Sequence, residues 1–353
     1  MKRIWSYVIF LLLFCILLTA CVDKMVEIED AEVLLEEAET KIDYSTIDNL
    51  VLEPGIRIAV VLKESKGAYW IAVTAGIQKA VDEFNEVLGY EGADKIIVTF
   101  DAPSSEKDVD SQINIIDTVL SENPAVLCLA AIDMESCEAQ VEAAAENEIP
   151  VIFIDSGVVN DSVQTICATD NYEAGKEAAR QMASRIGEEG DVAILAHIPM
   201  TETSKSRLSG FQDEVEENYP LIHIVDISYD EKSEEVDLVS SVTAVLKKYP
   251  LLDGYFGTDE SMTTNILEGV RAEKTEAISI IGFDSGIVLQ EAIKDGTLAG
   301  TISQNPYGMG YAAVVAGARA ILDKENDSFI NTGYIWVTMD NMKDDDIQKY
   351  LYE

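Results

Sequence analysis

Groups of polar and aromatic residues directly follow apolar runs in this sequence, and these groups could bind a ligand. The groups are Lys63–Trp70, Asp155–Gly157, Thr201–Arg207, Thr258–Glu260, Gly282–Ser285 and Ser303–Asn305. Aromatic faces pack against the C–H faces of a sugar ring, and Asp, Asn and Gln side chains hydrogen-bond its hydroxyl groups. An Asp or Ser after a strand is more often a helix N-cap, but capping alone explains six complementary groups poorly. The residue types therefore predict binding of a small polyhydroxylated molecule.

Motifs for catalysis are absent from the sequence. It contains no GxSxG, HExxH or P-loop motif, and its two histidines, His197 and His223, form no zinc or Cys–His pattern. Gly308-x-Gly310 lacks the third glycine of a dinucleotide-binding motif, and we interpret it as helix packing. Cys128 and Cys167 lie in apolar runs, where a buried thiol is usual. We therefore expect no enzyme activity, metal or cofactor.

Strands and helices must position these groups, and the sequence predicts their alternation from residue 56 onward. Strands are predicted at 56–62, 95–100, 125–130, 151–154, 165–168, 191–196, 222–227, 254–257, 278–282 and 299–303. Helices are predicted at 70–88, 107–120, 138–146, 172–186, 206–217, 234–248, 262–271, 287–294 and 307–322. Strands apolar on both faces, each followed by a helix, predict parallel sheets covered on both sides. Their number favours an α/β fold with two doubly wound lobes, whose ligands bind beyond the carboxyl ends of the strands.

The first residues predict where the protein works. A positive start and a short apolar run lead into Leu18-Thr19-Ala20-Cys21, which resembles the lipobox of bacterial lipoproteins. The resemblance implies that residues 1–20 are a signal peptide and that Cys21 carries lipid, which anchors an extracytoplasmic protein to the cell membrane. An uncleaved anchor and a plain secretory signal are the alternatives. Residues 21–55 are predicted to be an acidic tether, or alternatively to hold a partner-binding helix.

The charge of the chain restricts its partners. The formal net charge is −40 at pH 7, whereas nucleic-acid binding needs clustered Lys and Arg. The same charge disfavours contact of the body with an anionic membrane, so that membrane attachment is left to the lipid.

Six motifs, in combination and order, resemble the type I periplasmic binding proteins, specifically the ribose- and galactose-type sugar receptors of ABC transporters. The motifs are Gly67–Trp70, Ile149–Asp155, Thr169–Gly175, Arg207–Phe211, Ile281–Asp284 and Thr301–Gln304. The resemblance covers residues 56–339 and implies two lobes that close around a ligand, joined by a three-strand hinge. The predicted hinge lies near 168–170, 304–306 and 331–334. The predicted N-lobe is 56–168 plus 306–332, the C-lobe is 169–305 plus 333–342, and the C-terminal tail is 343–353.

The resemblance also implies a set of ligand-binding residues. Tyr69 and Trp70 match the paired aromatics of the ribose receptor, and Asp155, Asp284 and Gln304 match its ligand-bonding Asp, Asp and Gln. The sequence departs from the ribose receptors at Ser156 and Lys205, which replace arginines, and at Asp259 and Ala130, which replace asparagines. The predicted ligand-binding residues are Tyr69, Trp70, Asp155, Ser156, Lys205, Arg207, Asp259, Asp284 and Gln304.

The predicted function is capture of a monosaccharide or similar ligand by a monomer, which delivers it to an ABC transporter permease. Two further ligand classes stay open: Asp155-Ser156 also resembles receptors for the signal autoinducer-2, and three carboxylates could select an amine unless Lys205 or Arg207 balances them. Different roles are also compatible with the sequence. A receptor for a membrane sensor kinase would share the cleft, and LacI-type repressors share the fold but carry an N-terminal helix-turn-helix. An enzyme is the remote alternative.

Overall fold

The computed structural model describes residues 42–133, 135–157, 163, 165–197, 201–230, 237–275 and 278–352. The described residues from Tyr44 onward form one compact unit. The predicted signal peptide and Cys21 lie outside the described residues. No helix in the described ranges is long and apolar enough to cross a membrane.

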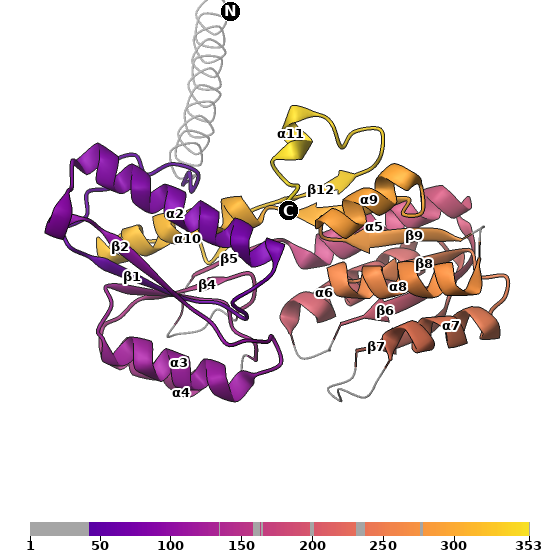
Figure 1. Cartoon of the computed structure of the whole chain (residues 1–353), viewed down its shortest axis with the longest axis horizontal. Coiled ribbons are helices and arrows are strands. Elements are labelled where there is room, and N and C mark those ends of the chain that lie inside the picture. The colour runs from indigo at the N-terminus through magenta and orange to yellow at the C-terminus, as the bar shows by residue number, and fades with distance from the viewer. Residues whose placement is uncertain are drawn as a thin grey trace, which may run out of the picture. The chain divides into compact units, whose positions relative to one another are not determined.

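The first lobe is built on a six-stranded sheet in which every neighbouring pair is parallel. Its strand order is β11-β5-β4-β3-β1-β2. The strands are β1 (Arg57–Val61), β2 (Ile97–Asp101), β3 (Val126–Leu129), β4 (Val151–Ile154), β5 (Thr165–Ala168) and β11 (Phe329–Asn331). Helices α2 (Ala68–Leu88) and α10 (Pro306–Ile321) lie on one face, and α3 (Val109–Ser121) and α4 (Glu138–Glu146) on the other (Figure 1). A short 3-10 helix, Gly92–Asp94, precedes β2.

The second lobe repeats this plan with a six-stranded sheet in the order β12-β10-β9-β8-β6-β7. The strands are β6 (Glu189–Ala196), β7 (Leu221–Tyr229), β8 (Gly254–Gly257), β9 (Ser279–Phe283), β10 (Gly300–Gln304) and β12 (Tyr334–Val337). The helices are α5 (Asn171–Ile186), α6 (Glu202–Asn218), α7 (Leu238–Lys248), α8 (Glu260–Glu273), α9 (Ile287–Asp295) and α11 (Asp345–Gln348). Side chains of α5 and α6 share one buried core with the sheet, and those of α7, α8 and α9 share another. Among the strands that the structure describes, only β12 pairs antiparallel, against β10.

The predicted α/β fold with two doubly wound lobes is therefore confirmed. Strands β11 and β12 were not among the predicted strands. Each has at most four residues, lies at a sheet edge with partly exposed side chains, and is too short for its pattern to predict a strand.

Two predictions about local structure are wrong. The helix predicted from residue 206 begins earlier, because α6 starts at Glu202, where the Thr201 side chain caps it by accepting a hydrogen bond from the Ser204 N–H. Part of the predicted tether belongs to the folded unit: Tyr44 and Leu52 are buried, and the Asp327 N–H donates to the Tyr44 hydroxyl at 2.7 Å. These few apolar residues lie in an acidic stretch, whose composition is typical of a solvent-exposed tether.

Candidate functional site

Equivalent strands of the two lobes each end in a buried aspartate. Asp155 follows β4 and Asp284 follows β9, with φ angles of 64° and 75°. This left-handed backbone is costly for most residues but is tolerated by Asp and Asn. Each backbone N–H donates to the neighbouring strand, at 2.9 Å to the Cys167 carbonyl and at 2.8 Å to the Ile302 carbonyl. Each sheet thus fixes one of the two carboxylates at the carboxyl ends of its strands.

Asp155 is held by two partners from the first lobe. The Lys63 ammonium lies 2.6 Å from Oδ2, and the Tyr69 hydroxyl donates to Oδ1 at 2.8 Å. Burial alone would raise the pKa of Asp155. The charge and hydrogen bond of Lys63, the charge of Arg207 and the hydrogen bond from Tyr69 together outweigh burial and lower this pKa. Lys63 is itself buried. Lys63 opens the first predicted group but was not among the predicted ligand-binding residues.

Asp284 has neutral partners. The Gln304 amide donates to Oδ1 at 2.7 Å, and the backbone N–H of Glu260 donates to Oδ2 at 3.3 Å. The Gln304 carbonyl oxygen in turn accepts from the Thr169 hydroxyl at 2.9 Å. Burial raises the pKa of Asp284, although the Arg207 guanidinium acts in the opposite direction. The structure therefore brings Asp284 and Gln304 into contact.

Arg207 is the second buried cation of the site. Its Nε donates to Asn171 Oδ1 at 2.8 Å, its Nη1 donates to the Thr258 carbonyl at 2.9 Å, and its guanidinium carbon lies 3.7 Å from the centre of the Phe283 ring. The charge of Arg207 contributes to the lowered pKa of Asp155 and opposes the rise that burial causes in the pKa of Asp284. Lys205 lies two positions before Arg207 on α6. Side chains two positions apart on a helix point about 200° apart, so Lys205 is exposed where Arg207 is buried. Lys205 is thus not the cation that balances the site.

The two predicted aromatic residues, Tyr69 and Trp70, have different partners. The Tyr69 ring is edge-on to Trp70, with centroids 5.1 Å apart, and its hydroxyl faces Asp155. Burial and, after it, the charge of Asp155 raise the pKa of Tyr69. Trp70 is buried, donates from Nε1 to Glu106 at 2.9 Å, and lines a separate pocket of the first lobe with Glu64 and Phe100.

Asp259 and Ser156 each form hydrogen bonds within their own lobe. Asp259 caps α8 by accepting from the Met262 N–H at 2.8 Å, and its other oxygen lies 3.3 Å from Nδ1 of His197. This capping is the ordinary role of an Asp after a strand. The Ser156 hydroxyl donates to the Ala131 carbonyl at 2.9 Å.

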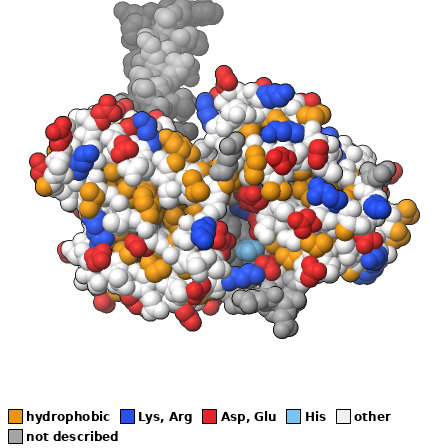
Figure 2. Space-filling model, in the orientation of Figure 1, with side chains coloured by type: hydrophobic (Ala, Val, Ile, Leu, Met, Phe, Trp, Pro, Cys, Tyr) orange, Lys and Arg blue, Asp and Glu red, His pale blue; other side chains and the backbone are white. Residues whose placement is uncertain are grey.

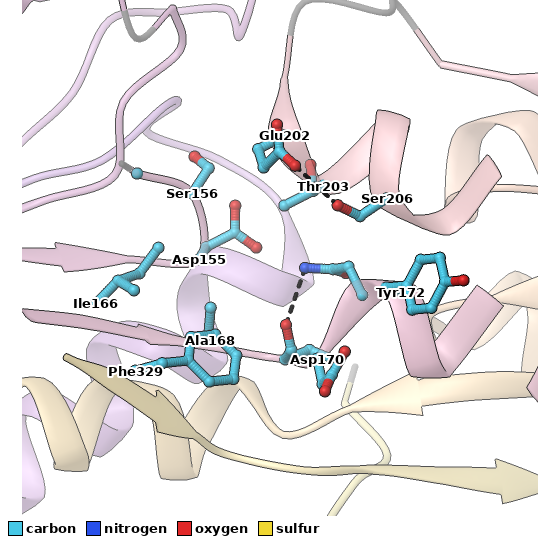
Figure 3. Close-up of a pocket in the computed structure, with 13 residues that line it drawn as sticks. Asp155, Ser156, Ile166, Ala168, Asp170, Tyr172, Glu202, Thr203, Ser206 and Phe329 are labelled. Atoms are coloured by element: carbon cyan, nitrogen blue, oxygen red, sulfur yellow. Dashed lines mark hydrogen bonds between the residues drawn. The ribbon is translucent and has the colours of Figure 1, made fainter. Parts of the chain in front are cut away.

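A pocket of about 250 Å³ lies against Asp155, between the ends of β4 and β5 and the beginnings of α5 and α6. Figure 3 shows Asp155 and Ser156 on one side of it and Glu202, Thr203 and Ser206 on the other. In Figure 2 the surface is hollowed between the lobes, with acidic and basic side chains around the hollow.

The charges of this arrangement decide its chemistry. Two buried carboxylates, Asp155 and Asp284, are matched by two buried cations, Lys63 and Arg207. The formal charges of these four side chains cancel, and the two carboxylates, together with the Gln304 amide and the Tyr69 phenol, can hydrogen-bond hydroxyls.

Comparisons with known proteins give a consistent result. A family model described as periplasmic binding protein domain matches residues 58–325. The ribose import binding protein of Bacillus subtilis is 24% identical over 251 residues, which are 70% of this chain and 76% of that protein.

Solved structures are also similar. An ABC transporter solute binding protein from Agrobacterium vitis with bound D-fucose has a TM-score of 0.75 and 29% identity, and covers 84% of this chain and 100% of that chain. A carbohydrate transporter solute binding protein from Agrobacterium radiobacter, in complex with D-arabinose, has a TM-score of 0.75 and 27% identity, with 84% and 98% covered.

Proposed function

This chain belongs to the periplasmic binding protein family, and from that premise we propose that it captures a small, neutral polyhydroxylated ligand, such as a monosaccharide, for an ABC importer. The observation that carries the proposal is the pair of buried aspartates, one from each lobe, balanced by Lys63 and Arg207. A relative named for ribose import and two similar solved structures with bound D-fucose and D-arabinose support a sugar as the ligand.

The charge balance argues against an amine. A buried carboxylate without a partner is costly and would favour a cationic ligand. Asp155 already has the Lys63 ammonium at 2.6 Å, and Arg207 acts on both aspartates. A neutral ligand keeps this balance, because its hydroxyls donate to carboxylates without adding charge.

The proposed mechanism is binding without a chemical step. Asp155 and Tyr69 come from the first lobe, and Asp284 and Arg207 from the second, so only a closed arrangement offers all four to one ligand. A ligand that binds the closed form better shifts the population toward it. The segments near residues 168–170, 304–306 and 331–334 would act as the hinge, and the closed form would dock on the permease.

Lipid attachment at Cys21 is a separate part of the proposal, and it rests on Leu18-Thr19-Ala20-Cys21. Cys21→Ala should leave the protein with an uncleaved leader or release it from membranes. Cys15→Ala, within the predicted leader, is the matched control and should leave membrane attachment unchanged. Mass spectrometry that finds Cys21 unmodified in the mature protein contradicts the anchor.

A thermal-shift panel tests the ligand class. The full chain is melted with D-ribose, D-arabinose, D-fucose, xylitol, autoinducer-2 and putrescine. A ligand at 100 times its dissociation constant adds about 2.7 kcal/mol to the stability of the folded state. We expect at least one sugar to raise the melting temperature and putrescine to leave it unchanged. Stabilisation by putrescine alone, or by no compound, contradicts the proposal.

A further inference from the structure

The residues after α11 return to the carboxyl edge of the second sheet instead of forming a separate tail. The hydroxyls of Ser285 and Ser303 both donate to the Tyr350 carbonyl, at 2.7 and 2.6 Å. The Gln290 amide donates to the Tyr352 carbonyl at 3.0 Å. All three donor residues are buried, and Ile347 is part of the core of this lobe. The backbone of residues 350–352 is therefore fixed beside the ends of β9 and β10.

This backbone directs Tyr352 into the site. The Tyr352 side chain is buried, and its hydroxyl accepts a hydrogen bond from the Ser285 N–H at 3.1 Å, one residue after Asp284. Its ring lies 5.9 Å from the Tyr69 ring at an interplanar angle of 77°. After burial, the charges of Asp284 and Glu260 are the causes that raise the pKa of Tyr352. Tyr352 thus neighbours a residue of each lobe.

The position of Trp70 shows why the contact between Tyr69 and Tyr352 is important. A sugar ring has two apolar faces or edges to cover, and the adjacent Tyr69 and Trp70 would be the simplest pair to cover them. Trp70 is instead bound to Glu106 and lines a different pocket. The ring that stands at an angle to Tyr69, next to Asp284, is Tyr352.

We propose that Tyr352 is a ligand-contacting residue of the proposed sugar site, where its ring forms a corner with Tyr69 and limits the size of the ligand. The inference rests on the proposed function and adds a residue from outside the two lobes as the sequence predicts them. The ligand lies in this corner, with its hydroxyls toward Asp155 and Asp284. Closure brings the two tyrosines together, because they belong to opposite lobes.

Calorimetric titration of the full chain with the best sugar of the panel tests this. Tyr352→Leu keeps apolar bulk but removes the aromatic face, and we expect a loss of affinity of about tenfold. Tyr352→Phe keeps the ring and should change affinity less than about threefold. Lys349→Ala is the control, because Lys349 is exposed in the same segment, and it should bind like wild type.

A methyl glycoside of the same sugar tests the limit on size. Wild type should bind it more weakly than the parent sugar, and Tyr352→Ala should narrow that difference. If Tyr352→Ala does not fold, the affinity of Tyr352→Leu for the parent sugar still tests whether Tyr352 contacts the ligand. If wild type binds the sugar and Tyr352→Leu binds it equally well, the inference is wrong and the proposed function stands. If wild type binds no sugar, the proposed function fails and this inference fails with it.

Discussion

Lys63 links the charge of the candidate site to the stability of the fold. It is buried, it pairs with Asp155 at 2.6 Å, and its ammonium lies 5.9 Å from the centre of the Trp70 ring. Removal of one partner of a buried ion pair leaves the other charged and desolvated, which costs more than the pair contributes. The same residue is therefore expected to affect both stability and ligand binding.

Lys63→Met should lower the free energy of unfolding by about 3–5 kcal/mol, because Asp155 remains buried without its cation. The double variant Lys63→Met/Asp155→Asn should recover part of this loss, since Asn tolerates the left-handed backbone at position 155. Lys66→Met, in the same loop but exposed, is the control. Urea unfolding measures all four proteins, and equal stability of wild type and Lys63→Met would contradict the account.

Glu260 gives a prediction for pH. Burial and, after it, the charge of Asp284 raise its pKa from 4.5 to about 7. The folded state thus favours protonated Glu260, so its contribution to stability is complete below about pH 4.5 and is lost as pH rises through 7. Glu260→Gln should reduce the fall in unfolding free energy between pH 5 and pH 8. Glu268→Gln, exposed on the same helix, should leave that fall unchanged, and an unaltered slope in Glu260→Gln would refute the assignment.

At the scale of elements, glycines allow the backbones of paired helices to lie in close contact. A Cβ on Gly175 of α5 would lie 2.2 Å from the Arg207 carbonyl oxygen of α6, and a Cβ on Gly210 of α6 would lie 2.1 Å from the Tyr172 carbonyl oxygen. The pair α2 and α10 repeats this: a Cβ on Gly310 would lie 2.1 Å from the Val73 carbonyl oxygen. The interpretation of Gly310 as a helix-packing residue is thereby confirmed.

Gly175→Ala should destabilise the protein by about 1–3 kcal/mol, because the added methyl group displaces backbone rather than a flexible side chain. The shift acts on α6 at Arg207, so ligand affinity should fall as well. Ser184→Ala, exposed on the same helix, is the control for helix propensity. Thermal unfolding and calorimetry measure the two effects. Wild-type stability in Gly175→Ala would mean that α5 and α6 can separate without cost.

The elements also show what the sequence could predict. Alternating apolar runs and helical periods predicted both lobes, and the rule that ligands bind at strand ends predicted Asp155 and Asp284. The sequence favoured exposed Lys205 over buried Lys63, because the burial of Lys63 depends on its contact with Asp155, 92 residues away, which no local pattern encodes. Tyr352 depends on contacts with Ser285 and Tyr69, far away in sequence, which no local pattern encodes.

For the whole molecule, contacts between the lobes are the basis of the closure mechanism. Tyr69 and Tyr352 meet across the site, and Lys107 of the first lobe bridges to Asp230 of the second at 3.1 Å. Each contact requires the lobes to be together. The contacts therefore favour the same arrangement that a bound ligand would favour.

Ligand binding should lower the radius of gyration, because contacts to both lobes shift the population toward closure. Lys107→Met should weaken ligand affinity less than about fivefold, as expected for a partly exposed ion pair. Lys95→Met is the control, since Lys95 is exposed on the first lobe. Small-angle scattering with and without saturating ligand measures closure. An identical radius in both states would contradict the hinge.

Calorimetric titration of the full chain with the best sugar, at low and high salt, tests the central claim most directly. The account predicts one site whose affinity changes little with salt, because the ligand is neutral and the site charges are balanced. Asp155→Asn and Asp284→Asn should each cost about 1.5–3 kcal/mol of binding, the range for hydrogen bonds to a charged group. Asp101→Asn, at the exposed end of β2, should bind like wild type. Wild-type affinity in both site variants, or salt-sensitive binding of an amine with no binding of sugar, would contradict the account.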